Sequence, residues 1–142
     1  MVYKLRNIFA ALAMMAVALA AATPAMADTD DPLFINLTTD QDHRADMALG
    51  FSKAMLERGH PVTIWLNDSG VLLASTEQSG RLADQQKALA ELMAKGATVI
   101  VCPACLKHYG VADGGLIAGT KLGNPDLTGG LLFKDDTKVL SW

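Results

Sequence analysis

The chain has 142 residues, 51% of them hydrophobic, and carries 12 Lys and Arg against 15 Asp and Glu, a formal net charge of −3. This length corresponds to one domain with a core of useful size. The acidic balance, without any basic cluster, argues against nucleic acid as a partner, because binding to a phosphate backbone depends on Lys and Arg.

The first 27 residues are typical of a secretory signal peptide. Lys4 and Arg6 precede an uninterrupted apolar run of 15 residues from Ile8 to Ala22, and Ala25-Met26-Ala27 forms a small-x-small cleavage site. The run is shorter than the ~20 apolar residues that a membrane-spanning helix needs. We therefore expect residues 28–142, with 10 basic and 15 acidic side chains, to be a periplasmic domain without stable membrane association after cleavage.

Apolar runs and helical periodicities alternate along the first half of this domain. Leu33-Phe34-Ile35-Asn36-Leu37-Thr38 predicts a buried strand, and the β-branched and aromatic run 62–66 predicts a second. Between them, apolar residues at 3–4 spacing predict a helix over 42–58, which Thr39 or Asp40 can cap. The expected segments that follow are a turn at 67–70, a short helix or apolar loop at 71–74, and an exposed polar stretch at 76–80.

The second half continues the alternation and then becomes less regular. A helix over 81–95 and a strand over 97–101 are expected, with a short helix over 106–109 after them. Residues 112–130 contain six glycines and one proline, which indicates a loose loop that can include a short strand or helical turn. Residues 137–142 predict a final strand. Strands separated by helices favour an α/β fold with a mainly parallel sheet of four to five strands, flanked by helices.

Polar and sulfur-bearing residues gather at one predicted edge of this sheet. Sites in open parallel sheets form at the carboxyl ends of the strands. Asp40 and His43 follow the first strand, Asn67 and Asp68 follow the second, and the motif Cys102-Pro103-Ala104-Cys105 follows the third. His60 precedes a strand and is therefore expected at the opposite edge.

The two cysteines are the candidate catalytic residues. Their spacing lets the sulfurs meet, as in dithiol–disulfide centres. A disulfide across only four residues closes a very short loop and would add little to the stability of the fold. Cys105 is expected to open the short helix, where unpaired N–H groups favour a thiolate, and Lys107 and His108 could add positive charge. His43 and Asp40 are further supporting candidates, although first-turn and capping roles explain them better, and His108 is better explained as a surface histidine.

Two other interpretations of the cysteines remain open. Both could be core residues, because cysteine is among the most buried residue types. With one histidine they could instead bind Cu⁺ or Zn²⁺, although a structural zinc site normally takes four ligands from two paired motifs, and the second motif is missing. We therefore predict no resident metal or other cofactor.

The domain resembles the DsrE/DsrF-like family, in particular its small exported members. The likeness rests on the first strand, on Gly59-His60-Pro61-Val62, on Gly70-Val71-Leu72-Leu73-Ala74, and on Val101-Cys102 with Leu106-Lys107 and Gly110-Val111 after it. The resemblance implies a homo-oligomer, often a trimer or hexamer. It also implies persulfide chemistry at Cys102, with a sulfur donor or acceptor protein as partner. Cys105 has no counterpart in the pattern.

Three hypotheses for function follow. The first is a periplasmic thiol protein that carries sulfur as a persulfide, or exchanges electrons, through Cys102 and Cys105. The second is a non-enzymatic oligomeric scaffold or partner-binding subunit, and the third is a copper or zinc protein. A neighbouring thiol would discharge a persulfide on Cys102 as sulfide, so family membership alone does not decide between sulfur transfer and redox exchange.

Overall fold

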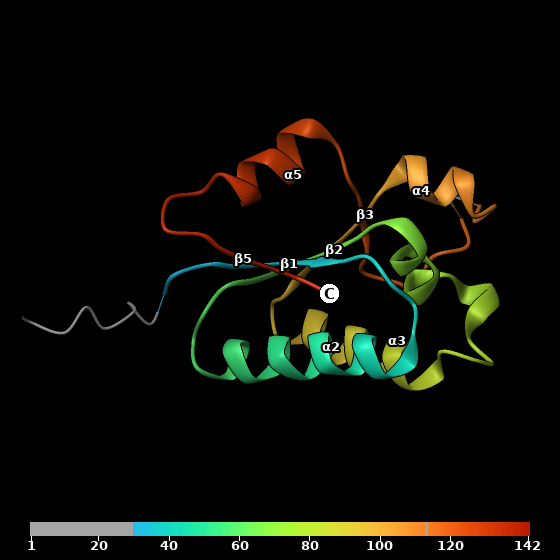
Figure 1. The fold of residues 1–142 in the computed structure, drawn as a ribbon, viewed down its shortest axis with the longest axis horizontal. Coiled ribbons are helices and arrows are strands. Elements are labelled where there is room, and N and C mark those ends of the chain that lie inside the picture. Colours follow the sequence, from blue (N-terminus) through green and yellow to red (C-terminus); the bar gives the residue numbers. More distant parts are fainter. Residues whose placement is uncertain (1–29, 113) are drawn as a thin grey trace, which may run out of the picture.

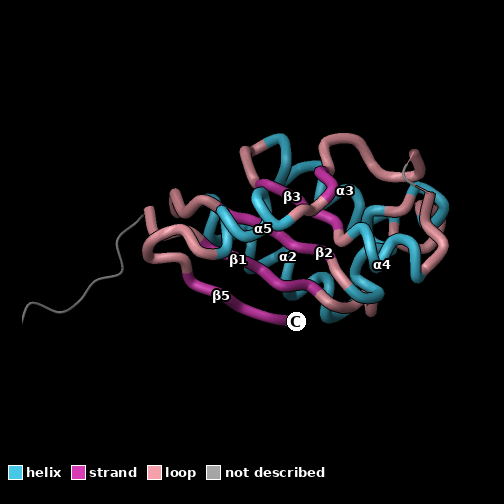
Figure 2. The backbone as a smooth tube through the Cα atoms, turned by 90° about the horizontal axis from the view of Figure 1, so that it is seen from above, coloured by secondary structure: helices cyan, strands magenta, loops and turns pink. Residues whose placement is uncertain are grey.

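A computed structural model describes residues 30–112 and 114–142, and the predicted signal peptide lies outside these residues. Within them, five strands form one entirely parallel sheet in the order β4-β3-β2-β1-β5 (Figures 1 and 2). The expected α/β fold with a parallel sheet flanked by helices is confirmed. No helix in the described part of the chain combines the length and apolarity needed to cross a membrane.

The elements alternate along the chain as the hydrophobic pattern predicts. They are β1 (Leu33–Leu37), α2 (Asp42–Glu57), β2 (Val62–Leu66), the 3-10 helices η1 (Asp68–Ala74) and η2 (Thr76–Gln78), α3 (Ala83–Ala94), β3 (Thr98–Val101), α4 (Pro103–His108), β4 (Lys121–Leu122), α5 (Pro125–Leu132) and β5 (Lys138–Ser141). Helices α2 and α3 lie on one face of the sheet, and α4 and α5 lie on the other (Figure 1).

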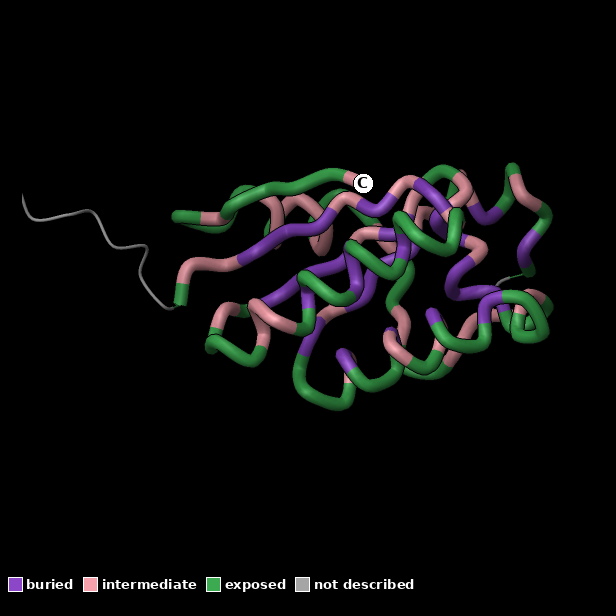
Figure 3. Tube along the Cα trace, turned by 60° about the horizontal axis from the view of Figure 1, so that its bottom comes forward, coloured by how far each residue is buried: buried purple, intermediate pink, exposed green. Residues whose placement is uncertain are grey.

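The main core lies between the sheet and the helices α2 and α3. Successive strand residues point to opposite faces, so every second residue of β1 faces these helices. These β1 residues are Leu33, Ile35 and Leu37. They are in register with Val62, Ile64 and Leu66 of β2, and all six are buried. The helices meet them with buried small and apolar side chains, namely Ala45, Ala48, Leu49, Leu89 and Leu92. Along the helices in Figure 3, buried segments recur between exposed ones.

A close backbone contact places η1 against the end of β1. A Cβ atom built on Gly70 would lie 2.3 Å from the carbonyl oxygen of Leu37, so only glycine fits there. The same turn of the chain carries Asp68, whose φ of 47° lies in the left-handed region. This crossing brings Asp68 to the carboxyl edge of the sheet, where α4 begins; η1 packs against α4.

Three sequence predictions need correction. Residues 112–130 are not merely a loose loop, because they contain β4 and most of α5, whose first turn is capped when Asn124 Oδ1 accepts the Leu127 N–H at 2.8 Å. Helix α4 begins at Pro103 rather than near Leu106, since proline suits the first helical turn and Cys102 caps it. Neither Thr39 nor Asp40 caps α2: its N-cap residue is Gln41, which forms no side-chain cap.

Candidate functional site

The cysteine motif lies where a buried strand ends and a helix starts. Residues 99–101 of β3 are buried, Cys102 is the N-cap residue of α4, and Pro103 is in its first turn. Cys105 therefore lies in the first turn of α4 rather than at its start. Its backbone N–H donates a hydrogen bond to Cys102 Sγ at 3.4 Å. This local geometry turns both side chains to the same side of the strand–helix junction.

The two thiols contact each other and are both half-buried. The Cys105 thiol donates a hydrogen bond to Cys102 Sγ, with the sulfurs 2.8 Å apart. A disulfide bond length is ~2.05 Å, so oxidation of the pair needs a movement of less than about 1 Å. The interpretation of both residues as packed, separated core cysteines does not fit this arrangement.

Burial raises the pKa of the Cys105 thiol, and its hydrogen bond to Cys102 acts in the same direction. The opposing influence is the backbone N–H of Asp68, which donates to Cys105 Sγ at 3.2 Å. Cys105 thus holds its proton more firmly than an ordinary cysteine. Cys102 Sγ accepts hydrogen bonds from both the Cys105 S–H and the Cys105 N–H.

Asp68 and Tyr109 form a brace beside the thiols. The Tyr109 hydroxyl donates to Asp68 Oδ1 at 2.5 Å, and this hydrogen bond, with burial and the Asp68 charge, raises the pKa of Tyr109. Asp68 was placed at this edge from the sequence, but Tyr109 was missed. The available signal was its spacing, because Tyr109 follows Cys105 by four residues and so lies on the same helix face.

The supporting candidates predicted near the motif are at the surface. Lys107 and His108 are exposed in the last turn of α4, and the His108 ring packs edge-on against Tyr109 with centroids 4.9 Å apart. His43 is exposed in the first turn of α2. Among the described residues, none of these three side chains forms a hydrogen bond with either sulfur; the partners of the sulfurs are each other and two backbone N–H groups.

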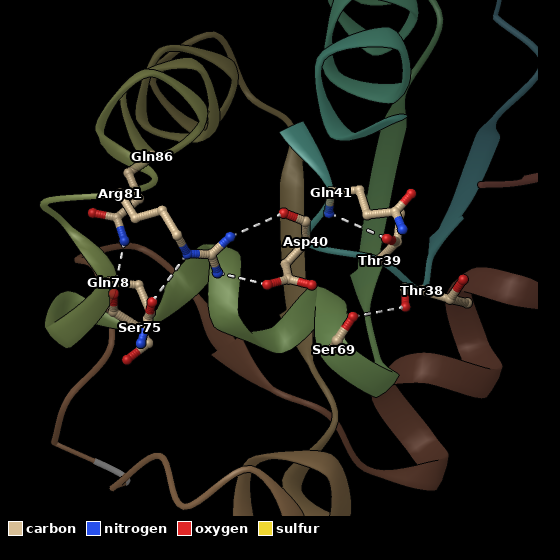
Figure 4. A network of polar contacts seen from close by, with 9 residues as sticks. All are labelled: Thr38, Thr39, Asp40, Gln41, Ser69, Ser75, Gln78, Arg81 and Gln86. Carbon is tan, nitrogen blue, oxygen red and sulfur yellow. Dashed lines mark hydrogen bonds and ion pairs between the residues drawn. The ribbon is translucent and has the colours of Figure 1, made fainter. Parts of the chain in front are cut away.

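Asp40 belongs to a separate polar network (Figure 4). Its carboxylate forms an ion pair with Arg81 at 2.5 Å, which links the loop before α2 to the loop before α3. Partial burial acts to raise the pKa of Asp40, but hydrogen bonds from Arg81 and Ser69 outweigh it and hold the pKa below its usual value. The interaction is structural in character, because Arg81 occupies the carboxylate.

The same geometry bears on metal binding. Within residues 30–112 and 114–142, no group of three His, Cys, Asp or Glu side chains is placed to hold a metal ion. The cysteines thus offer two sulfur ligands, and the histidine that the three-ligand hypothesis needs does not join them. The chemistry that the site itself provides is that of two neighbouring thiols.

The fold and this site together define a parallel α/β domain with a dithiol at the carboxyl end of a central strand. The model of the DsrE/DsrF-like family matches residues 32–136, most of the chain, and the protein belongs to that family. A sequence relative is the uncharacterized protein MJ0989 of Methanocaldococcus jannaschii, 36% identical over 80 residues, which are 56% of this chain and 70% of the relative.

Solved structures share the fold at low sequence identity. The protein of unknown function MTH1491 from Methanobacterium thermoautotrophicum superposes with a TM-score of 0.62 at 14% identity, covering 80% of this chain and 100% of its own. The ychN protein from E. coli superposes with a TM-score of 0.58 at 16% identity, covering 79% of this chain and 99% of its own. These similarities establish the architecture and leave the chemistry to be argued from the site.

Proposed function

We propose that this protein is a periplasmic thiol protein in which Cys102 is the attacking sulfur and Cys105 the resolving sulfur. The observation that carries the proposal is the contact between two half-buried thiols, 2.8 Å apart, at the carboxyl edge of the sheet. The periplasmic location rests on the signal sequence in residues 1–27. An oxidising compartment is one in which such a pair can cycle between dithiol and disulfide.

The first reaction is sulfur uptake at Cys102. The Cys102 thiolate attacks the terminal sulfur of a persulfide R–S–SH, the S–S bond breaks, and R–S⁻ leaves, which produces Cys102–S–SH. The family resemblance supports this step, because persulfide carriage is what it implies for the cysteine at this position. Transfer to an acceptor thiol completes a sulfur relay.

The second reaction is discharge by Cys105. Its thiolate attacks the Cys102 sulfur, HS⁻ leaves with the electron pair of the broken S–S bond, and a Cys102–Cys105 disulfide forms. A thiol reductant is then needed to restore the dithiol. Because the pKa of Cys105 is raised, little Cys105 thiolate exists near neutral pH. The raised pKa of Cys105 therefore slows discharge and favours transfer of the sulfur to an acceptor thiol.

An alternative function as an oligomeric scaffold has one observation in its favour. Apolar side chains are exposed near β5 on both faces of the sheet: Phe133 at the end of α5 is 83% exposed, Val139 is 50% exposed, and Leu140, 40% exposed, lies on the α2 face, where it lines a pocket with Phe51 and Met55. Exposed apolar groups of this kind often mark contacts between subunits. They support the expected homo-oligomer, trimeric or hexameric, and oligomerisation is compatible with either function. The third hypothesis, copper or zinc binding, lacks a third ligand among the described residues.

Mass spectrometry after treatment with inorganic polysulfide tests the thiol proposal. The reduced wild type should acquire a Cys102–Cys105 disulfide, and Cys105→Ser should accumulate one sulfane sulfur on Cys102. Cys102→Ser is the matched control and should react least, because Cys105 holds its proton more firmly. The proposal fails if neither the wild type nor Cys105→Ser shows an adduct or a disulfide. It also fails if Cys102→Ser accumulates sulfur as fast as Cys105→Ser.

A further inference from the structure

A pocket opens beside Cys102 and leaves Cys105 outside its lining. Its volume is about 250 Å³. It lies between the end of β2, the start of α4 and the start of α5. The residues around Cys102 in its wall are Trp65, Pro103, Gly123, Asn124, Pro125 and Thr128. The two sulfurs thus differ in their surroundings, since Cys102 borders the pocket and Cys105 Sγ accepts a hydrogen bond from the Asp68 N–H.

The segment that closes this pocket is held firmly to the sheet. The Gly123 N–H donates to the carbonyl oxygen of Val101 at 2.8 Å. A Cβ atom on Gly123 would lie 3.1 Å from that oxygen and 3.1 Å from Ile100 Cγ2, so the chain approaches β3 more closely than most side chains allow. The next residue, Asn124, caps α5. The part of the wall that Gly123 and Asn124 form is therefore fixed in place by hydrogen bonds of the chain.

The lining selects for small, uncharged groups. Apart from the Cys102 thiol, its side chains are neutral and mostly apolar: an indole, two prolines, an amide and a hydroxyl. Apart from the Cys102 thiolate itself, no lining side chain offers an opposite charge to a charged group, which would also lose hydration on entering the pocket. The volume is also below the ~300–1,000 Å³ of pockets that hold drug-sized ligands. A bulky, multiply charged thiol peptide is a poor fit on both counts.

We propose that this pocket receives the uncharged organic group of a small substrate R–S–S–X, where X is hydrogen in a persulfide or a second organic group in a disulfide. The inference rests on the proposed function of the cysteine pair. For a disulfide, the Cys102 thiolate attacks one sulfur and R–S⁻ leaves, forming a mixed disulfide. Cys105 then displaces the second R–S⁻, so that the dithiol loses two electrons and two thiols are released.

Three disulfides of similar size and different charge test the pocket. These are bis(2-hydroxyethyl) disulfide, which is neutral, cystamine, which is cationic, and 3,3′-dithiodipropionate, which is anionic. Stopped-flow rates with the reduced full-length protein are divided by the rates of the same disulfides with dithiothreitol, to remove intrinsic reactivity. We expect the normalised rate of the neutral compound to exceed both others by roughly fivefold or more.

A pair of charge variants reports on the pocket itself. Thr128→Asp should shift the preference toward cystamine and Thr128→Lys toward dithiodipropionate, each by roughly fivefold. Ser79→Asp and Ser79→Lys are matched controls, because Ser79 is exposed and outside the lining, and they should leave the preference unchanged. If the substrate is a persulfide, the second step releases HS⁻ in place of a second R–S⁻, and this product distinguishes a persulfide from a disulfide substrate.

The outcomes separate this inference from the function on which it rests. Equal normalised rates in the wild type, unaffected by either Thr128 variant, overturn the pocket while the dithiol chemistry stands. The absence of any reaction with all three disulfides, and of any Cys102–Cys105 disulfide after polysulfide treatment, overturns both. Equal shifts in the Thr128 and Ser79 variants would mean that overall charge, not the pocket, sets the preference, and would also overturn the inference.

Discussion

The two faces of the sheet are covered in different ways. On one face, α2 and α3 bury Ala48, Leu49, Leu89 and Leu92 against alternate residues of the strands. On the other, α4 contributes a single buried residue, Leu106, and α5 contributes none. Figure 3 shows the exposed β5 beside the buried β1. Packing on the first face holds the fold together, and the thinner second face leaves room for the thiols and the pocket.

Removing a side chain from the packed face should have the largest effect. Leu89→Ala deletes a fully buried side chain of α3, and we expect the free energy of unfolding to fall by about 2–5 kcal/mol. Phe133→Ala, at the end of α5, is the matched control and, at protein concentrations where the chain is monomeric, should change it by less than about 0.5 kcal/mol, because Phe133 is 83% exposed in the monomer. Urea unfolding measures both; similar losses would contradict the proposed division between the faces.

A glycine at the junction of the two regions should have the next largest effect. Gly70→Ala places a methyl group against the Leu37 carbonyl, and we expect a loss of about 1–3 kcal/mol. Gly50→Ala, in α2, meets no atom within 4 Å and should stabilise by up to about 1 kcal/mol. Because η1 carries Asp68, Gly70→Ala should also alter the rate at which Cys105 resolves an adduct. An unchanged rate would show that the position of η1 does not affect the reaction of Cys105.

On the second face of the sheet, which α4 and α5 cover, changes should affect the reactions of the thiols more than the free energy of unfolding. The rate at which Cys105 displaces a mixed disulfide from Cys102 should rise about tenfold per pH unit, up to a pKa above the ordinary ~8.5 of cysteine, because only the thiolate attacks. The raised pKa of Cys105 sets this direction. Rapid-quench measurements between pH 6 and pH 10, a range chosen around ~8.5, would record the profile. A plateau already reached at neutral pH would contradict the assignment.

Tyr109→Phe tests whether the hydrogen bond between Tyr109 and Asp68 influences the reactivity of Cys105. It removes the hydrogen bond to Asp68 without touching either sulfur. With Asp68 less firmly held, its N–H supports the Cys105 thiolate less, so the rate profile should move to higher pH by less than about one unit. The free energy of unfolding should change little, because the hydroxyl is exposed. A profile that stays in place would show that the brace does not position Cys105.

The smallest effect is expected at the Asp40–Arg81 pair. Asp40→Asn or Arg81→Gln should each lower the free energy of unfolding by less than about 1 kcal/mol, and the double variant should lose little more than either. The pKa of Asp40 is lowered in the folded state. Its contribution is therefore present above the unfolded pKa of ~3.9 and is lost as the pH falls through the lower folded value. Thermal melts at neutral and acid pH would check the sign.

The same contrast between the faces explains what the sequence could predict. The strands β1, β2 and β3 are buried and rich in apolar residues, so their pattern is strong, and the edge that holds Cys102 and Cys105 follows from their order. Helix α5 was missed because it contains Gly129 and Gly130 and buries no residue, which leaves no periodicity to detect. The motif Asn124-Pro125 was its only local sign.

The brace at the site could not be predicted for a different reason. It depends on the left-handed backbone of Asp68 and on the close approach of Gly70 to β1, which are properties of three-dimensional packing. The pairing of Asp40 with Arg81 likewise joins residues 41 positions apart. Local capping rules pointed to Asp40 as a cap, and a long-range ion pair took precedence.

The parallel pairing of β1 with β5 has a consequence for how the chain folds. The two strands are about a hundred residues apart in sequence, since Asn36 pairs with Ser141. Strands β1, β2 and β3, with α2 and α3, can associate early through shorter loops, whereas β5 must close a much longer one. Until it does, the hydrogen-bonding groups along one side of β1 stay open to pairing with other chains.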